Sequence, residues 1–532
     1  MNRIFPLLVG VSLLASYLSA QPPTFPEDSV FLEINDIRAR VNLGGDLFWD
    51  GLGFGKFEVP QGSGKNALFA TQTWIGGLDE SGQLRMAGQT YRQSGKDFWP
   101  GPAADTYDSA YFARYGKVWR INEDQILTHQ TQFDQPGYQT PEDIATWPGN
   151  GDSTNGEPWQ LAPFFDANSN GVYEPGEGDH PEFPGQQVVY QLYSDAQFPN
   201  TETMGESLGV DVHLMLYAYD APNDPALDQS VFLSHHIVNR SNQQLSELYL
   251  GIWEDIDLGF FADDYMGCDS SLNLYYGYNA DSLDNLPNGY GTTPPVMGTA
   301  FLNQDMAHFR QYLGDFSAQG NPQIAAHFYG YLQNLWKDST VLTLGGTGYG
   351  GTVPINYVYP GDPADTSQWS EGTAGLSPGD RRGLGSCGPF TLPAGGTLCV
   401  DVALIYARAD SGDQLASLPL LRTRTQEIQT FYEGNKTACD LYPDPVISNL
   451  AQSPVPFPLQ IFPNPTSDWI HIQPSAAAGN LEIMDLQGKL LLARRIQPNQ
   501  GQQISLKDFP DGTYLLRFQQ GFEYYSDKLV KR

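Results

Sequence analysis

A short acidic loop carries the clearest chemical pattern in this chain of 532 residues. Residues 166–177 read DANSNGVYEPGE and fit D-x-N-x-N-G-x5-E, the pattern of calcium loops. Because Ca²⁺ takes about six to eight oxygens, we expect ligands from Asp166, Asn168, Asn170, the Val172 carbonyl and Glu177. Nearby prolines disfavour flanking helices, so the pattern predicts an isolated calcium loop. The alternative is an Asn/Gly-rich turn without metal.

A second group of carboxylates follows further along the chain. It contains Asp255, Asp257, Asp263 and Asp264. Strand residues two apart point the same way, so Asp255 and Asp257 could share one cation with Asp263 or Asp264. A solvated acidic loop is an equal alternative. A carboxylate pair that hydrolyses glycosides is a third interpretation, but the sequence does not give the required separation.

Other residue types give no catalytic pattern. None of the eight histidines recurs at zinc-like spacing, and no G-x-S-x-G or H-E-x-x-H motif occurs. His235 and His236 are neighbours on a predicted strand, so we expect one to pack inside and the other to be exposed. The aromatics Trp74, Phe98, Trp99 and Trp369 could stack on sugars, although such residues are more often part of the core. The sequence therefore predicts no catalytic site.

The elements that must position these residues are mainly strands. Alternating or β-branched runs predict strands over Val210–Tyr219, Val231–Val238, Leu248–Trp253 and Leu398–Tyr406. Apolar residues at helical spacing predict helices over Pro322–Trp336 and Leu418–Tyr432. We therefore expect a mainly β, sandwich-like domain with a few helices over residues 21–439.

The net charge limits the possible ligands, and the cysteine count limits the possible disulfides. The formal net charge is −33, which disfavours binding to nucleic acids and favours solubility or cation binding outside the cell. The four cysteines allow three disulfide pairings. We favour Cys387–Cys399, which brackets one predicted hairpin, together with Cys268–Cys439.

The N-terminus and the region near residue 450 mark two boundaries. Residues 1–20 carry Arg3, an apolar run and a small-residue end, as in a secretory signal peptide. No later segment is apolar enough to cross a bilayer, so we expect no membrane span in the mature protein. Residues 440–458 are rich in proline and predict an extended linker. Beyond the linker the composition changes, because 459–532 holds eight of the 28 basic and seven of the 61 acidic residues.

The C-terminal residues 459–532 show short alternating segments separated by turns, which predict a small β-sandwich. Four motifs follow in order: Phe462-Pro463-Asn464-Pro465, Asp485-Leu486-Gln487-Gly488, Phe509-Pro510-Asp511-Gly512-Thr513-Tyr514 and Lys528-Leu529-Val530-Lys531. With these motifs the tail resembles the type A sorting domain of type IX secretion cargo. The resemblance implies an immunoglobulin-like tail that addresses the protein to the type IX secretion machinery. It also implies a place outside the cell or on the outer-membrane surface of a gram-negative bacterium.

Parts of the central region resemble a group of secreted proteins that carry the same tail. The similar stretches are Trp74-Ile75-Gly76-Gly77, Asp97-Phe98-Trp99-Pro100-Gly101-Pro102, Gly178-Asp179-His180-Pro181 and Asp263-Asp264-Tyr265-Met266-Gly267-Cys268-Asp269. This resemblance implies a shared fold and brings no activity.

Three functions remain open. The first is a calcium-stabilised extracellular protein that acts by binding, in adhesion, matrix or glycan attachment. The second is a secreted polysaccharide hydrolase, which would require close carboxylates with raised pKa values in a cleft. The third is a structural component of the envelope. The presence of metal-binding patterns and the lack of a catalytic motif favour the first.

Overall fold

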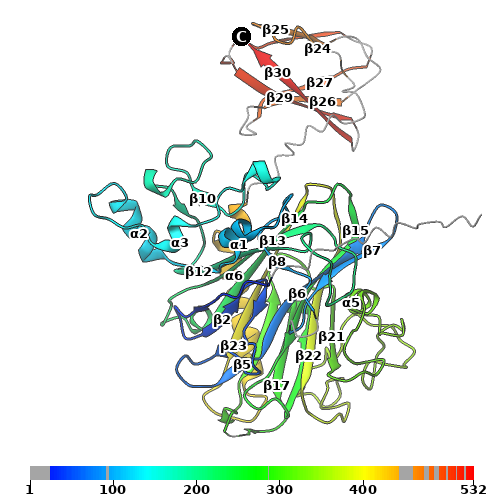
Figure 1. Cartoon of the computed structure of the whole chain (residues 1–532). Helices are drawn as coiled ribbons and strands as arrows, with labels where there is room; N and C mark the ends of the chain where they lie inside the picture. Colours follow the sequence, from blue (N-terminus) through cyan, green and yellow to red (C-terminus); the bar gives the residue numbers. More distant parts are fainter. Residues whose placement is uncertain are drawn as a thin grey trace, which may run out of the picture.

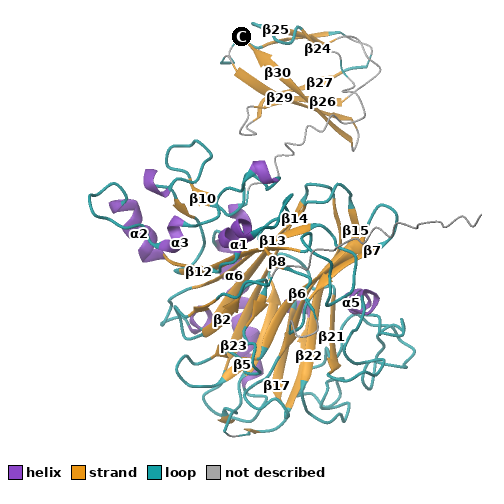
Figure 2. Ribbon diagram, viewed as in Figure 1, coloured by secondary structure: helices purple, strands orange, loops and turns teal. Residues whose placement is uncertain are grey.

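The computed structural model describes residues 24–91, 95–285, 287–442, 459, 461–472, 479–484, 490–498, 501–507, 509–510, 512–520 and 523–532. The predicted signal peptide and residues 443–458 of the predicted linker lie outside this range. The described residues are mainly strands, as predicted (Figures 1 and 2). Two large antiparallel sheets form the domain that precedes the linker.

The first sheet has ten strands and carries the β15–β22 pair discussed below. Its strands follow the order β21 (His308–Leu313), β22 (Arg381–Leu392), β15 (Leu245–Asp255), β6 (Ala70–Leu78), β3 (Asp46–Leu47), β2 (Arg38–Asn42), β4 (Phe57–Glu58) and β5 (Asn66–Leu68), with β1 (Ser29–Leu32) beside β2 and β7 (Leu84–Gly88) beside β6. Helix α5 (Ala325–Leu332) packs against this sheet.

The second sheet has nine strands. They follow the order β16 (Asp264–Asp269), β17 (Leu274–Asn279), β20 (Val296–Phe301), β23 (Thr397–Ala407), β14 (Ser230–Asn239), β13 (Val210–Ala218), β12 (Gln187–Ser194) and β8 (Trp99–Pro100), with β9 (Trp119–Asn122) beside β12. Two short hairpins stand apart from the large sheets, β10 (Phe164–Phe165) with β11 (His180–Pro181) and β18 (Leu283–Asp284) with β19 (Gly291–Thr292).

One hydrophobic core lies between the two sheets, and a second lies on the outer face of the second sheet. Trp253 of β15 and Val402 of β23 belong to the first core. The second core includes Tyr217 of β13 and Leu421 of α6 (Ser417–Gly434). Four shorter helices are α1 (Ser109–Tyr115), α2 (Glu123–Gln132), α3 (Glu142–Ala145) and α4 (Pro225–Asp228). Because the second sheet is covered on both faces, every residue of β13 and β14 is buried.

This double burial corrects one expectation. His235 and His236 point to opposite faces of β14, yet both are buried, so neither is the exposed residue that we predicted. His235 Nε2 lies 2.9 Å from the Thr73 hydroxyl in the core. The His236 ring stacks on Tyr442 with a centroid distance of 3.8 Å. Burial lowers the pKa of both rings.

The predicted strands agree with β13, β14, β15 and β23, and the second predicted helix agrees with α6. The first predicted helix is shorter than expected. Ile324 has an extended backbone and is 48% exposed, so α5 begins only after it. Asn334 has a positive φ of 61°, which is incompatible with a continuing helix.

The predicted disulfide pairing is wrong. Cys399 is bonded to Cys439, while Cys268 and Cys387 are buried free thiols. The prediction treated Cys387 and Cys399 as the two arms of one hairpin. Their strands, β22 and β23, follow each other in sequence but belong to different sheets, so the two side chains do not meet. The observed bond ties the end of the large domain to β23.

The tail forms a small immunoglobulin-like sandwich with its own core. One sheet contains β24 (Ile461–Phe462), β25 (Trp469–Ile472) and β28 (Gln502–Ser505). The other contains β26 (Gly479–Met484), β27 (Leu490–Ile496), β29 (Gly512–Gln520) and β30 (Glu523–Lys531). Ile470, Ile483 and Phe518 lie among the buried residues of this core. The two sheets agree with the small β-sandwich that we predicted for the tail.

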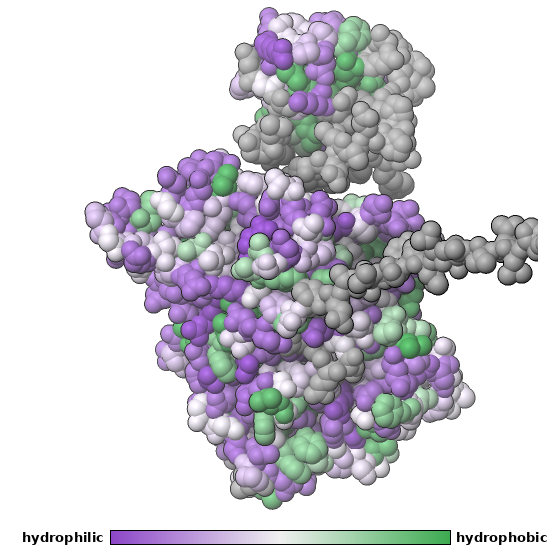
Figure 3. All heavy atoms as spheres, in the orientation of Figure 1, coloured by the Kyte–Doolittle hydropathy of each residue, from purple (hydrophilic) through white to green (hydrophobic). Residues whose placement is uncertain are grey.

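Hydrophilic residues cover most of the face shown in Figure 3, and hydrophobic residues occur there in small groups. Within the part of the chain that the structure describes, no helix combines the length and hydrophobicity needed to cross a bilayer.

Candidate functional site

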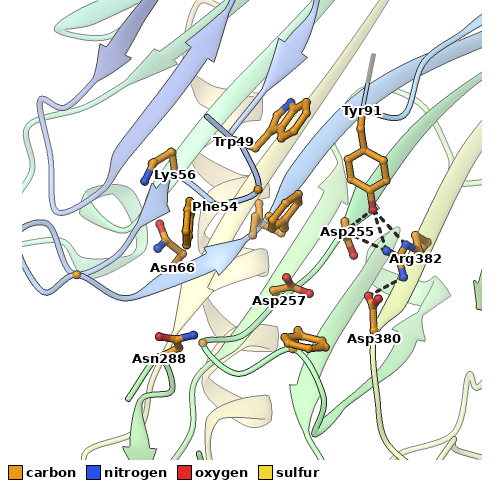
Figure 4. A pocket seen from close by; sticks show the side chains of 17 residues that line it. Trp49, Phe54, Lys56, Asn66, Tyr91, Asp255, Asp257, Asn288, Asp380 and Arg382 are labelled. Atoms are coloured by element: carbon orange, nitrogen blue, oxygen red, sulfur yellow. Dashed lines mark hydrogen bonds and ion pairs between the residues drawn. The ribbon is translucent and has the colours of Figure 1, made fainter. Parts of the chain in front are cut away.

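A cavity of about 630 Å³ opens where β15 ends (Figure 4). Aromatic residues form much of its wall, namely Trp49, Phe54, Phe69, Tyr91 and Phe261. The charged residues that line it are Lys56, Asp255, Asp257, Asp380 and Arg382. Phe54 and Phe261 are 65% and 47% exposed, so their rings are available to a ligand. The cavity thus combines apolar surface with three carboxyl groups and two basic side chains.

Strand pairing brings the charged residues together. In the antiparallel β15–β22 pair, Asp255 stands directly opposite Arg382. Asp380 directly precedes β22 and lies two residues from Arg382, and both line the cavity. Arg381 between them instead forms an ion pair with the buried Glu371, at 2.7 Å. This alternation is the ordinary consequence of strand geometry.

Three carboxylates lie close together in this cavity, and two of them pair with one guanidinium. Oxygens of Asp255, Asp257 and Asp380 lie within 4.8 Å of one another. Arg382 Nη1 lies 2.6 Å from Asp380 Oδ1, and its Nη2 lies 3.6 Å from Asp255 Oδ2. The Tyr91 hydroxyl donates a 2.5 Å hydrogen bond to the same Asp255 oxygen. One positive charge therefore lies beside three carboxyl groups.

One oxygen of Asp255 and one of Asp257 lack hydrogen-bond partners among the described residues. Asp255 is 3% exposed, and its Oδ1 accepts no hydrogen bond. Asp257 Oδ1 is likewise buried and without a partner. Burial raises the pKa of Asp255 to about 6, although Arg382 opposes the shift. Burial, and then the charges of Asp255 and Asp380, raise the pKa of Asp257 well above its usual value. The site therefore favours a bound proton or a bound cation.

Two residues of the predicted acidic cluster do not line the cavity, although burial and then the charge of Asp257 raise the pKa of Asp264. Asp263 Oδ2 accepts a hydrogen bond of 2.8 Å from the Asn285 amide, and Asp264 Oδ2 accepts one of 3.0 Å from the Leu258 backbone. Neither residue lines the cavity, and the carboxylate that joins Asp255 and Asp257 is Asp380. Sequence reasoning missed Asp380, Phe54 and Phe261. To predict Asp380, one would have to know which residues of β15 and β22 stand opposite one another.

The predicted calcium loop is folded mainly by its own backbone. Asp166 Oδ2 accepts from the Gly171 N–H at 2.6 Å, and Asn170 Oδ1 accepts from the Val172 N–H at 2.7 Å. Asn168 Oδ1 accepts from the Asn170 N–H at 3.1 Å. The first of these bonds comes foremost among the causes that lower the pKa of Asp166. Glu177 is exposed at the end of a short 3₁₀ turn, Pro175–Glu177.

A third group of possible metal ligands is explained by the disulfide. Cys399 and Cys439 lie near Asp401, but both sulfurs are used in their mutual bond. The Asp401 carboxylate accepts a hydrogen bond of 2.5 Å from the Tyr432 hydroxyl.

Three of the tail motifs meet in space. Asn464 donates a 2.6 Å hydrogen bond to the Lys528 carbonyl and accepts one of 2.9 Å from the Val530 N–H. Lys531 Nζ donates to the Phe509 carbonyl at 2.6 Å. The first, third and last motifs therefore lock the end of the chain into the sandwich. The motif at 485–488 lies outside the described residues.

Residues 460–532 match the family model described as a secretion system C-terminal sorting domain. The tail is the address of type IX secretion cargo. This places the protein among secreted or cell-surface proteins and implies an interaction of the tail with the secretion machinery.

Other comparisons add little. A search of curated proteins found no match. Among solved structures, a polysaccharide lyase is similar at 6% identity and a TM-score of 0.22, over 70% of this chain and 39% of the lyase. The BSP domain of a biofilm-associated protein is similar at 9% identity and a TM-score of 0.14, over 95% of this chain and 81% of that one. Such low scores carry no argument about fold or function.

Proposed function

We propose that this protein is exported by type IX secretion and binds a saccharide, at the cell surface or outside the cell, in the cavity of its large domain. The observation that carries the proposal is the placement of the exposed Phe54 and Phe261 rings in the same cavity as unpartnered carboxylate oxygens. Aromatic rings stack on the C–H faces of sugars, and buried carboxylates accept hydrogen bonds from hydroxyl groups. Such binding would serve adhesion, matrix formation or glycan attachment.

We further propose that calcium stabilises the large domain through the loop of Asp166, Asn168, Asn170, Val172 and Glu177. The spacing of the loop supports this assignment. The side-chain bonds to Gly171 and Val172 give the loop a defined shape around its oxygens.

Glycoside hydrolysis is a second candidate, favoured by one specific observation. Oxygens of Asp255 and Asp257 lie within 4.8 Å, and burial raises both pKa values. Retaining glycosidases hold two carboxyl groups about 5–5.5 Å apart, one ionised and one protonated. Here Arg382 and Tyr91 favour the ionised form of Asp255, while Asp257 Oδ1 has no partner. Asp255 would act as the nucleophile and Asp257 as the acid.

One experiment separates these candidates. The mature protein is incubated with a panel of glycans and polysaccharides, and both retention and release of reducing ends are measured. If the protein only binds, glycans are retained and no reducing ends are released. Phe54→Ala should then abolish the retention. The matched control is Leu52→Ala, because Leu52 lies in the same loop and is 85% exposed but does not line the cavity. Release that disappears in Asp257→Asn, with retention unchanged, would establish the hydrolase. If neither occurs with any glycan, a structural role in the envelope becomes the better explanation.

The sorting address can be tested separately. Deletion of residues 459–532 should leave the protein in the periplasm, because the address for the outer-membrane exporter is lost. Surface display of the truncated protein at the normal level would contradict this assignment.

A further inference from the structure

We infer that Asp255, Asp257 and Asp380 form a calcium site inside the cavity, and that the bound ion holds the saccharide through its hydroxyl oxygens. The inference rests on the proposed function and adds the chemistry by which the cavity would recognise its ligand.

Charge balance is the first argument. When all three are ionised, the carboxylates carry three negative charges, and Arg382 supplies one positive charge within ion-pair distance of two of them. Lys56 also lines the cavity, but it pairs with Asp50 at 3.5 Å. The remaining charge of −2 matches one divalent cation. Such a cation would turn the repulsion among the carboxylates into attraction.

The unpartnered oxygens are the second argument. Asp255 is 3% exposed and lines the cavity, yet its Oδ1 has no hydrogen-bond partner within the described part of the chain. Leaving a buried carboxylate oxygen without a partner costs free energy, which an ion would recover. Asp257 Oδ1 is in the same condition.

The existing contacts of the carboxylate oxygens show why a bound ion would keep some of its ligand positions open. Tyr91 and Arg382 occupy Asp255 Oδ2, and Arg382 also occupies Asp380 Oδ1. One oxygen of each residue, together with Asp257, remains for the ion. Because Ca²⁺ takes about six to eight oxygens, the protein would leave several positions to water or to sugar hydroxyls. Phe54 and Phe261 in the wall would then contact the sugar ring.

The test measures calcium binding to the mature protein by equilibrium dialysis. To exclude the loop at 166–177, the background protein is the Asp166→Ala/Glu177→Ala variant. It should bind one calcium per chain at millimolar concentration, which Asp257→Asn with Asp380→Asn should abolish. Asp380→Asn alone should weaken binding at least tenfold, and its side chain is 40% exposed, so the substitution preserves the fold. The matched control, Asp263→Asn, should bind normally because Asp263 does not line the cavity.

Saccharide retention is then compared in calcium and in chelator. Retention lost in chelator and in the Asp257/Asp380 variant supports the inference. Unchanged calcium binding in that variant, or equal retention in chelator, would overturn it while the proposed function stood. Calcium binding at the cavity without retention of any glycan would instead refute the proposed function.

Discussion

The two acidic regions of the large domain solve the same electrostatic problem in different ways. In the loop at 166–177, side-chain oxygens accept hydrogen bonds from the backbone of neighbouring residues, and the pKa of Asp166 is lowered. In the cavity, carboxylates from two distant segments meet, two of their oxygens have no partner in the described structure, and the pKa values of Asp255 and Asp257 are raised. The loop stabilises its charge locally, whereas the cavity leaves charge for a ligand.

The difference teaches that a metal-ligand pattern within one short segment can satisfy itself. A loop of Asp and Asn residues folds back on its own N–H groups, with or without an ion. Asp255 and Arg382 have no such freedom, because the pairing of β15 with β22 fixes their positions. The predictions below test this contrast.

The largest expected effect comes from removing the Arg382 guanidinium, the positive charge beside the cavity carboxylates. Arg382→Ala leaves Asp255 buried without its ionic partner, and breaking such a buried pair costs about 3–5 kcal/mol. Denaturant unfolding in chelator should show this loss, and millimolar calcium should restore part of it.

The control for this prediction is Arg38→Ala. Arg38 pairs with Glu33 at the surface, with side chains 38% and 34% exposed, so its removal should cost about 1 kcal/mol or less. Equal losses of stability in the two variants would show that the ion pair in the cavity contributes no more than the one at the surface.

Glu254 separates the effect of burial from that of crowded charges. It is fully buried beside Asp255 in sequence, it accepts a 2.7 Å hydrogen bond from Thr299, and burial raises its pKa to about 7. The folded state therefore binds the proton more tightly than the unfolded state. Stability should fall as the pH rises from about 4.5 to 7, by about 3 kcal/mol in total. Because Asp255 and Asp257 also have raised pKa values, Glu254→Gln should keep a fall across pH 4–8, but one smaller by about this amount. A parallel profile in both proteins would refute the assignment.

The calcium loop should give a smaller, calcium-dependent effect. At a free concentration of 100 times the dissociation constant, calcium binding to the folded state stabilises it by about 2.7 kcal/mol. Asp166→Ala with Glu177→Ala should remove most of this gain, measured as the shift in the thermal midpoint between calcium and chelator.

A matched control removes the same charge from an exposed helix face, with Glu427→Ala and Glu433→Ala in α6. The loop is only a turn if the wild-type midpoints coincide, or if the loop variant keeps the full response.

The smallest effect concerns the backbone of the loop. Gly171 has a positive φ of 76°, so Gly171→Ala should destabilise the protein by about 1 kcal/mol, although no atom lies near the new methyl group. Gly176 has equal space and no such φ, so Gly176→Ala should be neutral or slightly stabilising. Equal effects of the two substitutions in denaturant unfolding would mean that the loop relaxes freely.

Much of the architecture could be predicted, because the signals were local. The β13 and α6 segments were recognisable from their apolar patterns, and the tail from its ordered motifs. The burial of both His235 and His236 could not be predicted, since an alternating pattern does not show that a sheet is covered on both faces. The disulfide prediction failed for a related reason, because the two cysteines lie on consecutive strands that belong to different sheets.

The sequence by itself determined the mainly β class, the strong negative charge and the sorting address. Each depends on composition or on residues close together in the chain. Only the tertiary structure decided that Asp255 and Asp257 meet Asp380 rather than Asp263 or Asp264 in a cavity beside Phe54. The physical reason is strand pairing. Opposing Asp255 to Arg382 is a choice of partner strand and register, and this choice depends on how the whole sheet buries its hydrophobic face.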